Sequence, residues 1–194
     1  MGDYFALFNY NKDEACKLNF FMDEKKNQRV GVFVDVQNLY YSARNLYNSY
    51  VNFSKIKSLA EREGKLVRTI AYGIKADITK EGSFFDALRE AGFEVKLKDL
   101  QIFPGGVKKG DWDVGMTVDM IRLAPKLDIV VLVSGDGDFV DLIEYLQNLG
   151  VFVMVVAFGA SSSSRIVDKV DSFVDMDKKK DFFLLKKIRN GSNK

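Results

Sequence analysis

The stretch Ile129-Val130-Val131-Leu132-Val133-Ser134-Gly135-Asp136 decides the fold class of this chain, because five consecutive apolar residues end in a small polar turn. An unalternating apolar run of this length is typical of a strand that is covered on both faces of a sheet. Further runs of this kind occupy residues 30–34, 66–72 and 151–156, and a weaker one occupies 93–97. We therefore expect a buried, mostly parallel central sheet.

Segments with the period of an amphipathic helix lie between these runs. They cover residues 37–47, 53–63, 83–91, 113–124 and 139–149. Gly64, Gly92 and Gly150 follow three of them, and we expect each glycine to end its helix in a left-handed conformation. Because parallel strands need crossover connections, this alternation predicts an α/β fold with three layers, α/β/α.

The composition excludes several kinds of active site. The 194 residues include no histidine, so the usual general base and the commonest transition-metal ligand are missing. Cys16 is the single cysteine, which excludes an internal disulfide and any site with several cysteine ligands, and which favours a reducing compartment. Catalysis must therefore use carboxylates, lysine, tyrosine or a hard metal ion with oxygen ligands.

The charge balance and the apolar pattern indicate a cytoplasmic protein that does not contact membranes. The 29 basic and 27 acidic residues leave a net charge of +2, so any polyanion must bind to a local surface. No apolar run approaches the roughly 20 residues of a membrane helix, and residues 1–10 lack the pattern of a secretory signal. We expect a soluble, unexported chain.

One domain with two short extensions fits the length, since domains usually contain about 100–200 residues. The α/β pattern spans residues 29–176, after a Phe-rich extension at 1–28 and before a basic tail at 177–194. Apolar residues such as Phe183 are spaced in this tail as in a basic amphipathic helix. A terminal helix that docks by its apolar side is the simpler interpretation, and a tail that steers RNA is the alternative.

Aspartates gather where the carboxyl ends of the strands are expected, which is the edge where open α/β sheets bind ligands. Asp35 follows the first strand, and Asp136 and Asp138 follow the 129–133 strand. Asp113 begins the preceding helix, whose amino end lies at the same edge. Because ionised carboxylates repel one another, such a cluster is stable only with protonation or with a bound cation, and we expect Mg²⁺ or Mn²⁺.

Each aspartate also has a simpler interpretation, because aspartate is a good helix N-cap. Asp113 and Asp138 stand where they could cap the helices that follow them. Capping does not explain why Asp35 should converge with them, so we favour the metal site. Gly135 and Gly137 permit a tight turn and the close approach of a ligand to the backbone.

The loop before Asp113 carries further candidates for substrate binding. Lys108 and Lys109 stand where a phosphate backbone would meet cations, although ordinary surface lysines are an equal alternative. Trp112 is suited to stacking on a base, and a half-buried packing role is its alternative. Asp119 lies about 9 Å further along the helix and about 120° around it, so it is a weaker candidate for ligation.

Three segments, taken in chain order, form one pattern. They are Val32-Phe33-Val34-Asp35-x-x-Asn38-Leu39, then Lys109-Gly110-Asp111-Trp112-Asp113-Val114 with Asp119, then Ser134-Gly135-Asp136-Gly137-Asp138-Phe139. This pattern resembles the LabA-like branch of the NYN domain family, over about residues 29–175. Ser163-x-x-Ile166 and Val170-Asp171-x-Phe173 resemble the final helix and strand of that family.

The resemblance implies a PIN-like, Rossmann-like fold with a metal-dependent ribonuclease site, so that residues 29–176 form the NYN domain. It implies two groups of site residues. The metal-binding positions are Asp35, Asp113, Asp136 and Asp138, and the supporting polar residues are Asn38, Ser134 and Asp119.

The function we expect is a divalent-metal-dependent ribonuclease that hydrolyses RNA phosphodiester bonds with Mg²⁺ or Mn²⁺. A non-catalytic RNA-binding or regulatory module of the same fold is one alternative. A phosphatase with Asp136 as its nucleophile is another, although the accompanying downstream motif is not evident. RNA is the expected partner, and self-association stays open.

Overall fold

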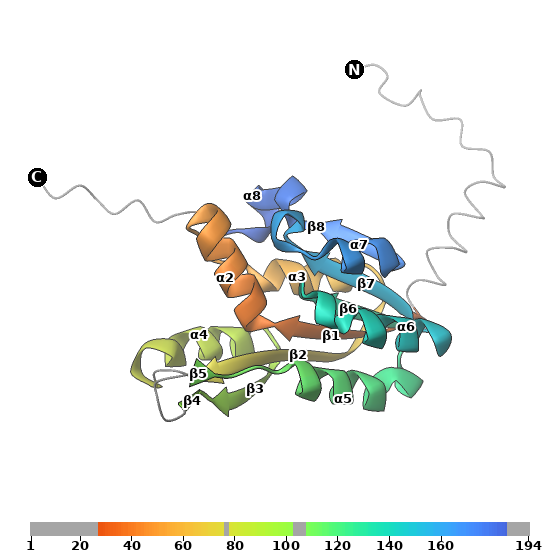
Figure 1. Cartoon of the computed structure of the whole chain (residues 1–194), viewed down its shortest axis with the longest axis horizontal. Coiled ribbons are helices and arrows are strands. Elements are labelled where there is room, and N and C mark those ends of the chain that lie inside the picture. The colour runs from red at the N-terminus through yellow and green to blue at the C-terminus, as the bar shows by residue number, and fades with distance from the viewer. Residues whose placement is uncertain (1–26, 76–77, 103–107, 186–194) are drawn as a thin grey trace, which may run out of the picture.

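A six-stranded parallel sheet forms the centre of the computed structural model, which describes residues 27–75, 78–102 and 108–185 (Figure 1). The strand order is β3-β2-β1-β6-β7-β8. The α/β fold predicted from the sequence is therefore confirmed. The strands are β1 (Arg29–Asp35), β2 (Lys65–Lys75), β3 (Glu94–Asp99), β6 (Ile129–Val133), β7 (Phe152–Ala157) and β8 (Ser172–Asp175).

The strand β1 lies between β2 and β6, and the direction of sheet growth reverses there. The chain builds outward from β1 to β3, crosses back to β6, and then builds outward to β8. Val34 of β1 pairs with Val133 of β6, so these two strands are neighbours in the sheet. Their carboxyl ends form the switch point at which ligands bind in open α/β sheets.

Helices cover both faces of the sheet, as expected for three layers (Figure 1). Alternation along β1 sends Val32 and Val34 to one face and Phe33 to the other, and all three side chains are fully buried. The face of Val32 packs against α2 (Val36–Tyr47), α3 (Phe53–Ala60), α4 (Ile78–Glu90) and α8 (Lys180–Phe183). The face of Phe33 packs against α5 (Asp113–Leu123), α6 (Val140–Asn148) and α7 (Ser164–Lys169).

The remaining elements are short. They are the antiparallel pair β4 (Gln101–Ile102) and β5 (Lys108–Lys109), and the 3-10 turns η1 (Ala124–Lys126), η2 (Gly137–Phe139), η3 (Gly159–Ser161) and η4 (Met176–Lys179). Among the described residues, no helix combines the length and the apolar character needed to cross a bilayer.

Two of the three glycines expected to end helices behave as predicted. Gly92 and Gly150 have φ angles of +87° and +80°, in the left-handed region that favours glycine. The prediction for Gly64 is wrong, because α3 already ends at Ala60 and Gly64 has no positive φ. A Cβ at Gly64 would lie 2.3 Å from the carbonyl oxygen of Gln28, so the close approach of the backbone requires glycine.

The amphipathic helix expected in the C-terminal tail is short where the structure describes it. The helix α8 ends at Phe183, and Leu184 forms an antiparallel bridge with Val51. Phe183 is fully buried in the same core cluster as Val34. This first part of the tail therefore docks by its apolar side, whereas residues 186–194 and 1–26 lie outside the described residues.

Candidate metal centre at the carboxyl edge of the sheet

The two strands at the switch point deliver Asp35 and Ser134 side by side, because each residue directly follows the paired residues Val34 and Val133. Asp35 then caps α2, and its Oδ1 accepts a hydrogen bond of 3.0 Å from the backbone N–H of Asn38. Asp35 therefore caps α2 and also lies at the carboxyl edge of the sheet, so the two interpretations of this residue do not exclude each other.

Asn38 and Ser134 connect the two loops. The backbone N–H of Gly135 donates to Oδ1 of Asn38 at 3.1 Å. The hydroxyl of Ser134, which is fully buried, lies 3.4 Å from Oδ2 of Asp35 and accepts from the N–H of Asp136 at 3.2 Å. These two side chains therefore fix the loop after β6 against the start of α2.

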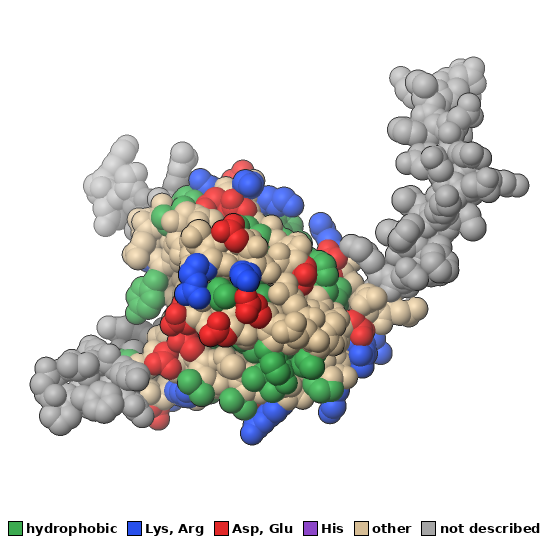
Figure 2. All heavy atoms as spheres, turned by 45° about the vertical axis from the view of Figure 1, so that its right-hand side comes forward, with side chains coloured by type: hydrophobic (Ala, Val, Ile, Leu, Met, Phe, Trp, Pro, Cys, Tyr) green, Lys and Arg blue, Asp and Glu red, His purple; other side chains and the backbone are tan. Residues whose placement is uncertain are grey.

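Three of the four predicted aspartates converge closely. Asp113, Asp136 and Asp138 each offer a carboxylate oxygen, and these oxygens all lie within 4.8 Å of one another. Asp113 is the first residue of α5, and Asp136 caps η2 by accepting from the N–H of Asp138 at 3.0 Å. More generally, Figure 2 shows acidic side chains gathered on one part of the surface, with basic groups beside them.

Asp35 lies outside that group of three but interacts with its charges. Burial raises the pKa of Asp35 to about 6, and the negative charges of Asp113 and Asp136 add to this rise, while the backbone N–H of Asn38 opposes it. Burial also raises the pKa of Asp113, together with the charges of Asp136, Asp111 and Asp138, against a lowering effect of Lys98. The edge thus carries an excess of negative charge.

The capping alternative is wrong for Asp113 and Asp138. The N-cap positions of α5 and α6 are Trp112 and Phe139, and neither makes a side-chain capping bond. Asp113 instead lies in the first turn of α5, where the helix dipole favours a negative charge. Capping therefore accounts for Asp35 and Asp136 but not for the positions of Asp113 and Asp138.

Asp119 does not belong to this group of carboxylates, and its side chain connects α5 to the sheet by hydrogen bonds. Its Oδ2 accepts from the hydroxyl of Tyr72 at 2.8 Å and from Nζ of Lys96 at 2.6 Å. Burial raises the pKa of Asp119, but these two hydrogen bonds, together with the charges of Lys96 and Arg122, lower the pKa overall. Its partners give Asp119 a structural role, about 9 Å along α5 from Asp113 at 1.5 Å per residue.

Trp112 packs against the sheet. Its Nε1 donates to the carbonyl of Gly73 at 2.8 Å, and its ring meets that of Tyr72 edge-on with 5.2 Å between centroids. Nζ of Lys98 lies 4.3 Å from the centroid of the Trp112 ring, over one face. These contacts favour the packing interpretation of Trp112 over base stacking.

Lys108 and Lys109, predicted to bind substrate, form the strand β5. The structure describes the backbone of these two lysines but not their side chains. Their contact with phosphate stays a prediction. Lys98, which no pattern in the sequence indicated, lies close enough to Asp113 to lower its pKa, and its Nζ also donates to the carbonyl of Asp111 at 3.1 Å.

The glycines of the loop after β6 serve close packing. A Cβ at Gly135 would lie 2.5 Å from Oγ of Ser162, and a Cβ at Gly137 would lie 2.7 Å from Oγ of Ser163. The N–H of Ser163 donates to the carbonyl of Gly135 at 2.9 Å. Ser162 and Ser163 belong to a run of four serines at residues 161–164. No local pattern in the sequence indicates that this run lies against the loop after β6.

Comparison with known proteins relates this chain to one family and to several proteins. Residues 29–177 match the family described as the NYN domain. "Low amplitude and bright protein LabA" of Synechococcus elongatus is 25% identical over 164 residues, which cover 77% of this chain and 84% of that protein. The crystal structure of "a protein of unknown function VPA0982" from Vibrio parahaemolyticus aligns with a TM-score of 0.75 and 40% identity, covering 82% of this chain and 97% of the other.

Proposed function

This chain belongs to the NYN domain family, and from that premise we propose that it is a divalent-metal-dependent ribonuclease. The observation that carries the proposal is the convergence of Asp113, Asp136 and Asp138, whose carboxylate oxygens lie within 4.8 Å of one another. They come from two segments that the topology brings to the switch point of the sheet. Such an edge is the usual position of a ligand site in this architecture.

The donor atoms fit a hard cation. All three side chains offer carboxylate oxygen, which Mg²⁺ and Mn²⁺ prefer, and the chain has no histidine that would favour a softer metal. The raised pKa values of Asp35 and Asp113 mark a local excess of negative charge, which a bound cation would relieve. Mg²⁺ or Mn²⁺ therefore suits the residues present.

The aspartates at this edge have two different roles in the proposed reaction. A cation held by Asp113, Asp136 and Asp138 would supply positive charge to a phosphodiester during hydrolysis. Asp35 adds a fourth carboxylate from the neighbouring strand, with its oxygens oriented by the N–H of Asn38 and the hydroxyl of Ser134. This orientation is set before any substrate arrives, which lowers the reorganisation required in the transition state.

RNA cleavage is tested with purified protein and labelled single-stranded RNA, structured RNA and DNA, each with Mn²⁺ or with EDTA. We expect cleavage of RNA in Mn²⁺ and none in EDTA. Asp136→Asn should lower the cleavage rate about 100-fold or more, because a lost ligand removes several kcal/mol of charge stabilisation. The matched control is Asp168→Asn, at an exposed position on α7, which should cleave like the wild type.

Two results would overturn this function. Cleavage that persists in EDTA would eliminate the metal mechanism, and full activity of Asp136→Asn would remove the aspartates from it. RNA binding without cleavage across all substrates would instead favour the non-catalytic RNA-binding module. A trapped aspartyl-phosphate on Asp136 would point to the phosphatase.

A further inference from the structure

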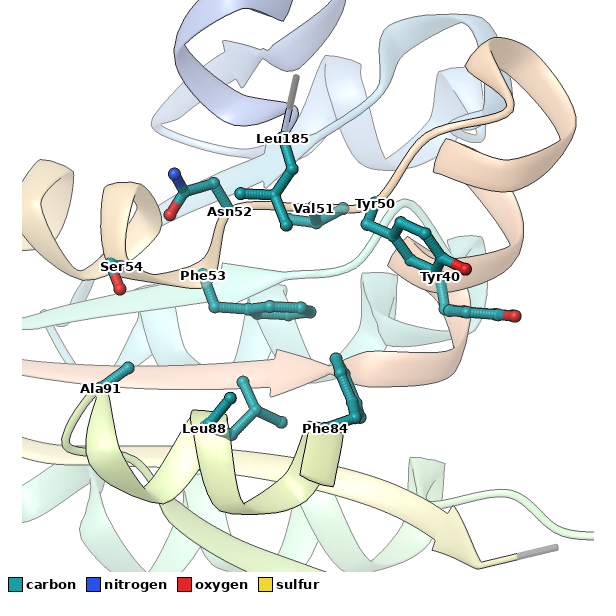
Figure 3. Close-up of a pocket in the computed structure, with 11 residues that line it drawn as sticks. Tyr40, Tyr50, Val51, Asn52, Phe53, Ser54, Phe84, Leu88, Ala91 and Leu185 are labelled. Carbon is teal, nitrogen blue, oxygen red and sulfur yellow. The ribbon is translucent and has the colours of Figure 1, made fainter. Parts of the chain in front are cut away.

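An aromatic pocket of about 250 Å³ lies on the face of the sheet opposite α5 (Figure 3). The rings of Tyr40, Tyr50, Phe53 and Phe84 line it. They come from α2, the segment leading into α3, the start of α3, and α4. Phe53 belongs to the core cluster of the Val32 face. The proposed function leaves this pocket without a role.

The walls of the pocket are aromatic, and its rim is open to solvent. Phe53 and Phe84 meet edge-on with 5.8 Å between centroids, and Tyr40 and Tyr50 lie 6.4 Å apart. The exposed fractions of Tyr40 and Tyr50 are 41% and 51%, so these rings remain available to a ligand. The pocket therefore presents ring faces and edges to an incoming planar group.

A cation lies beside one side of the pocket. The guanidinium of Arg44 lies 5.1 Å from the centroid of the Tyr50 ring. None of the described residues that line the pocket is acidic. A ligand that joins an apolar ring to a negatively charged group matches this arrangement, because the ring can stack while the anion meets the cation at the rim.

The volume restricts the ligand further. Pockets for drug-sized molecules usually measure about 300–1,000 Å³, so a pocket of about 250 Å³ suits a smaller group such as one heterocyclic base. A nucleotide combines such a base with a phosphate. Aromatic side chains that stack on bases, beside cations that meet the backbone, are the usual means of binding single-stranded nucleic acid.

The pocket opens at the same edge of the sheet as the aspartates. In Figure 3 the arrowhead of β1 points to the end of the pocket where Tyr40 and Tyr50 lie. Asp35 ends β1 and caps α2, and Tyr40 follows five residues later, about 7.5 Å along the helix axis at 1.5 Å per residue. Successive phosphates of a stacked strand are about 3.4 Å apart along its axis, so a short oligonucleotide can reach both places.

We propose that this aromatic pocket holds one unpaired base of an RNA strand whose backbone passes the amino end of α2 on its way to the aspartates. The inference rests on the proposed function and extends it to the substrate class, which is single-stranded RNA or an unpaired segment. Because every base has a stacking face, the pocket accepts different bases with little preference. Arg44 meets a phosphate that adjoins the bound base.

The test measures RNA binding in EDTA, so that no metal-dependent cleavage intervenes. The probe is a fluorescently labelled single-stranded oligoribonucleotide, and the readout is anisotropy. Tyr40→Ala should raise the dissociation constant about 5- to 100-fold, the usual loss for one stacked base. Tyr40→Phe keeps the ring and should bind within about twofold of the wild type. The control Tyr145→Ala removes a ring with 44% exposure on α6 and should change nothing.

A second probe separates stacking from charge. An abasic ribose-phosphate chain of the same length should bind the wild type more weakly, and Tyr40→Ala should not weaken it further. Equal loss on both probes, or wild-type affinity in Tyr40→Ala, would overturn the proposal. Sedimentation that shows a dimer dissociated by Tyr50→Ala, with RNA binding intact, would also overturn it, because the pocket would then be a protein interface.

The cleavage assay distinguishes this failure from that of the proposed function. Binding that depends on Tyr40, without any Mn²⁺-dependent cleavage, supports the pocket and removes the nuclease. Cleavage that depends on Asp136, with binding indifferent to Tyr40, removes the pocket and leaves the nuclease. Near-ultraviolet circular dichroism of each variant confirms that the fold is kept.

Discussion

Replacing Asp35 with asparagine should stabilise the metal-free protein at neutral pH. The pKa of Asp35 rises from 3.8 to about 6 in the folded chain, mainly because the carboxylate is buried. At about 1.36 kcal/mol for each tenfold change in proton affinity, keeping this group ionised costs the folded state about 3 kcal/mol at pH 7. Asparagine removes this cost and can still cap α2, because its side-chain oxygen can accept from the N–H of Asn38.

The sign of the pH dependence follows from the raised pKa. Asp35 binds its proton more tightly in the folded chain, so the free energy of unfolding loses this contribution as the pH rises from about 4 to about 6. Urea denaturation in EDTA at pH 4, 5.5 and 7.5 measures it. We expect Asp35→Asn to exceed the wild type by about 2–3 kcal/mol at pH 7.5 and to approach it at pH 4.

Added Mn²⁺ should narrow this difference in stability. A cation at one hundred times its dissociation constant stabilises the folded state by about 2.7 kcal/mol, and the variant with fewer carboxylates should gain less. Asp168→Asn, at an exposed position on α7, serves as the control for removing one negative charge. If Asp35→Asn were no more stable than the wild type in EDTA at pH 7.5, the reasoning from buried charge would be refuted.

Two further substitutions test the packing around the site by urea denaturation. Gly135→Ala should destabilise the fold by about 1–3 kcal/mol, because the new Cβ would meet Oγ of Ser162 at 2.5 Å. The control Gly82→Ala lies in α4, where a Cβ has nothing within 4 Å, and it should be neutral or stabilising. Equal changes in the free energy of unfolding for the two variants would contradict this reasoning. Lys96→Met should lower the free energy of unfolding by about 1–3 kcal/mol at pH 7, because it removes the ion-pair partner of the half-buried Asp119. This loss should shrink as the pH falls through the lowered pKa of Asp119, and a loss that stayed constant would contradict the role of the ion pair.

The sequence predicted the sheet well because its strands are buried on both faces. Residues 129–133 form β6 with the expected bounds, since a run of five apolar, mostly β-branched residues is typical of a strand buried on both faces. The helix α4 begins at Ile78, five residues before the expected start, because residues 78–82 lack a clear apolar period. Local periodicity therefore located the core elements better than the solvated ends of helices.

The convergence of Asp113, Asp136 and Asp138 was predictable from topology alone, because parallel strands send their carboxyl ends to one edge. The partners of Asp119 were not predictable, since Tyr72 and Lys96 lie on strands and are 47 and 23 residues away in the chain. No local pattern specifies which side chains meet across such separations. The same limit applies to the serines that pack against the glycines of the loop after β6.

The central position of β1 has a consequence for synthesis on the ribosome. Its partner β6 lies far along the chain, as the 99-residue separation of Asp35 and Ser134 shows. Closing so long a loop is slow, because its entropy is lost before the contacts are gained. A nascent chain can pair β1 with β2 and β2 with β3 early, yet one edge of β1 stays open to other chains until β6 has emerged.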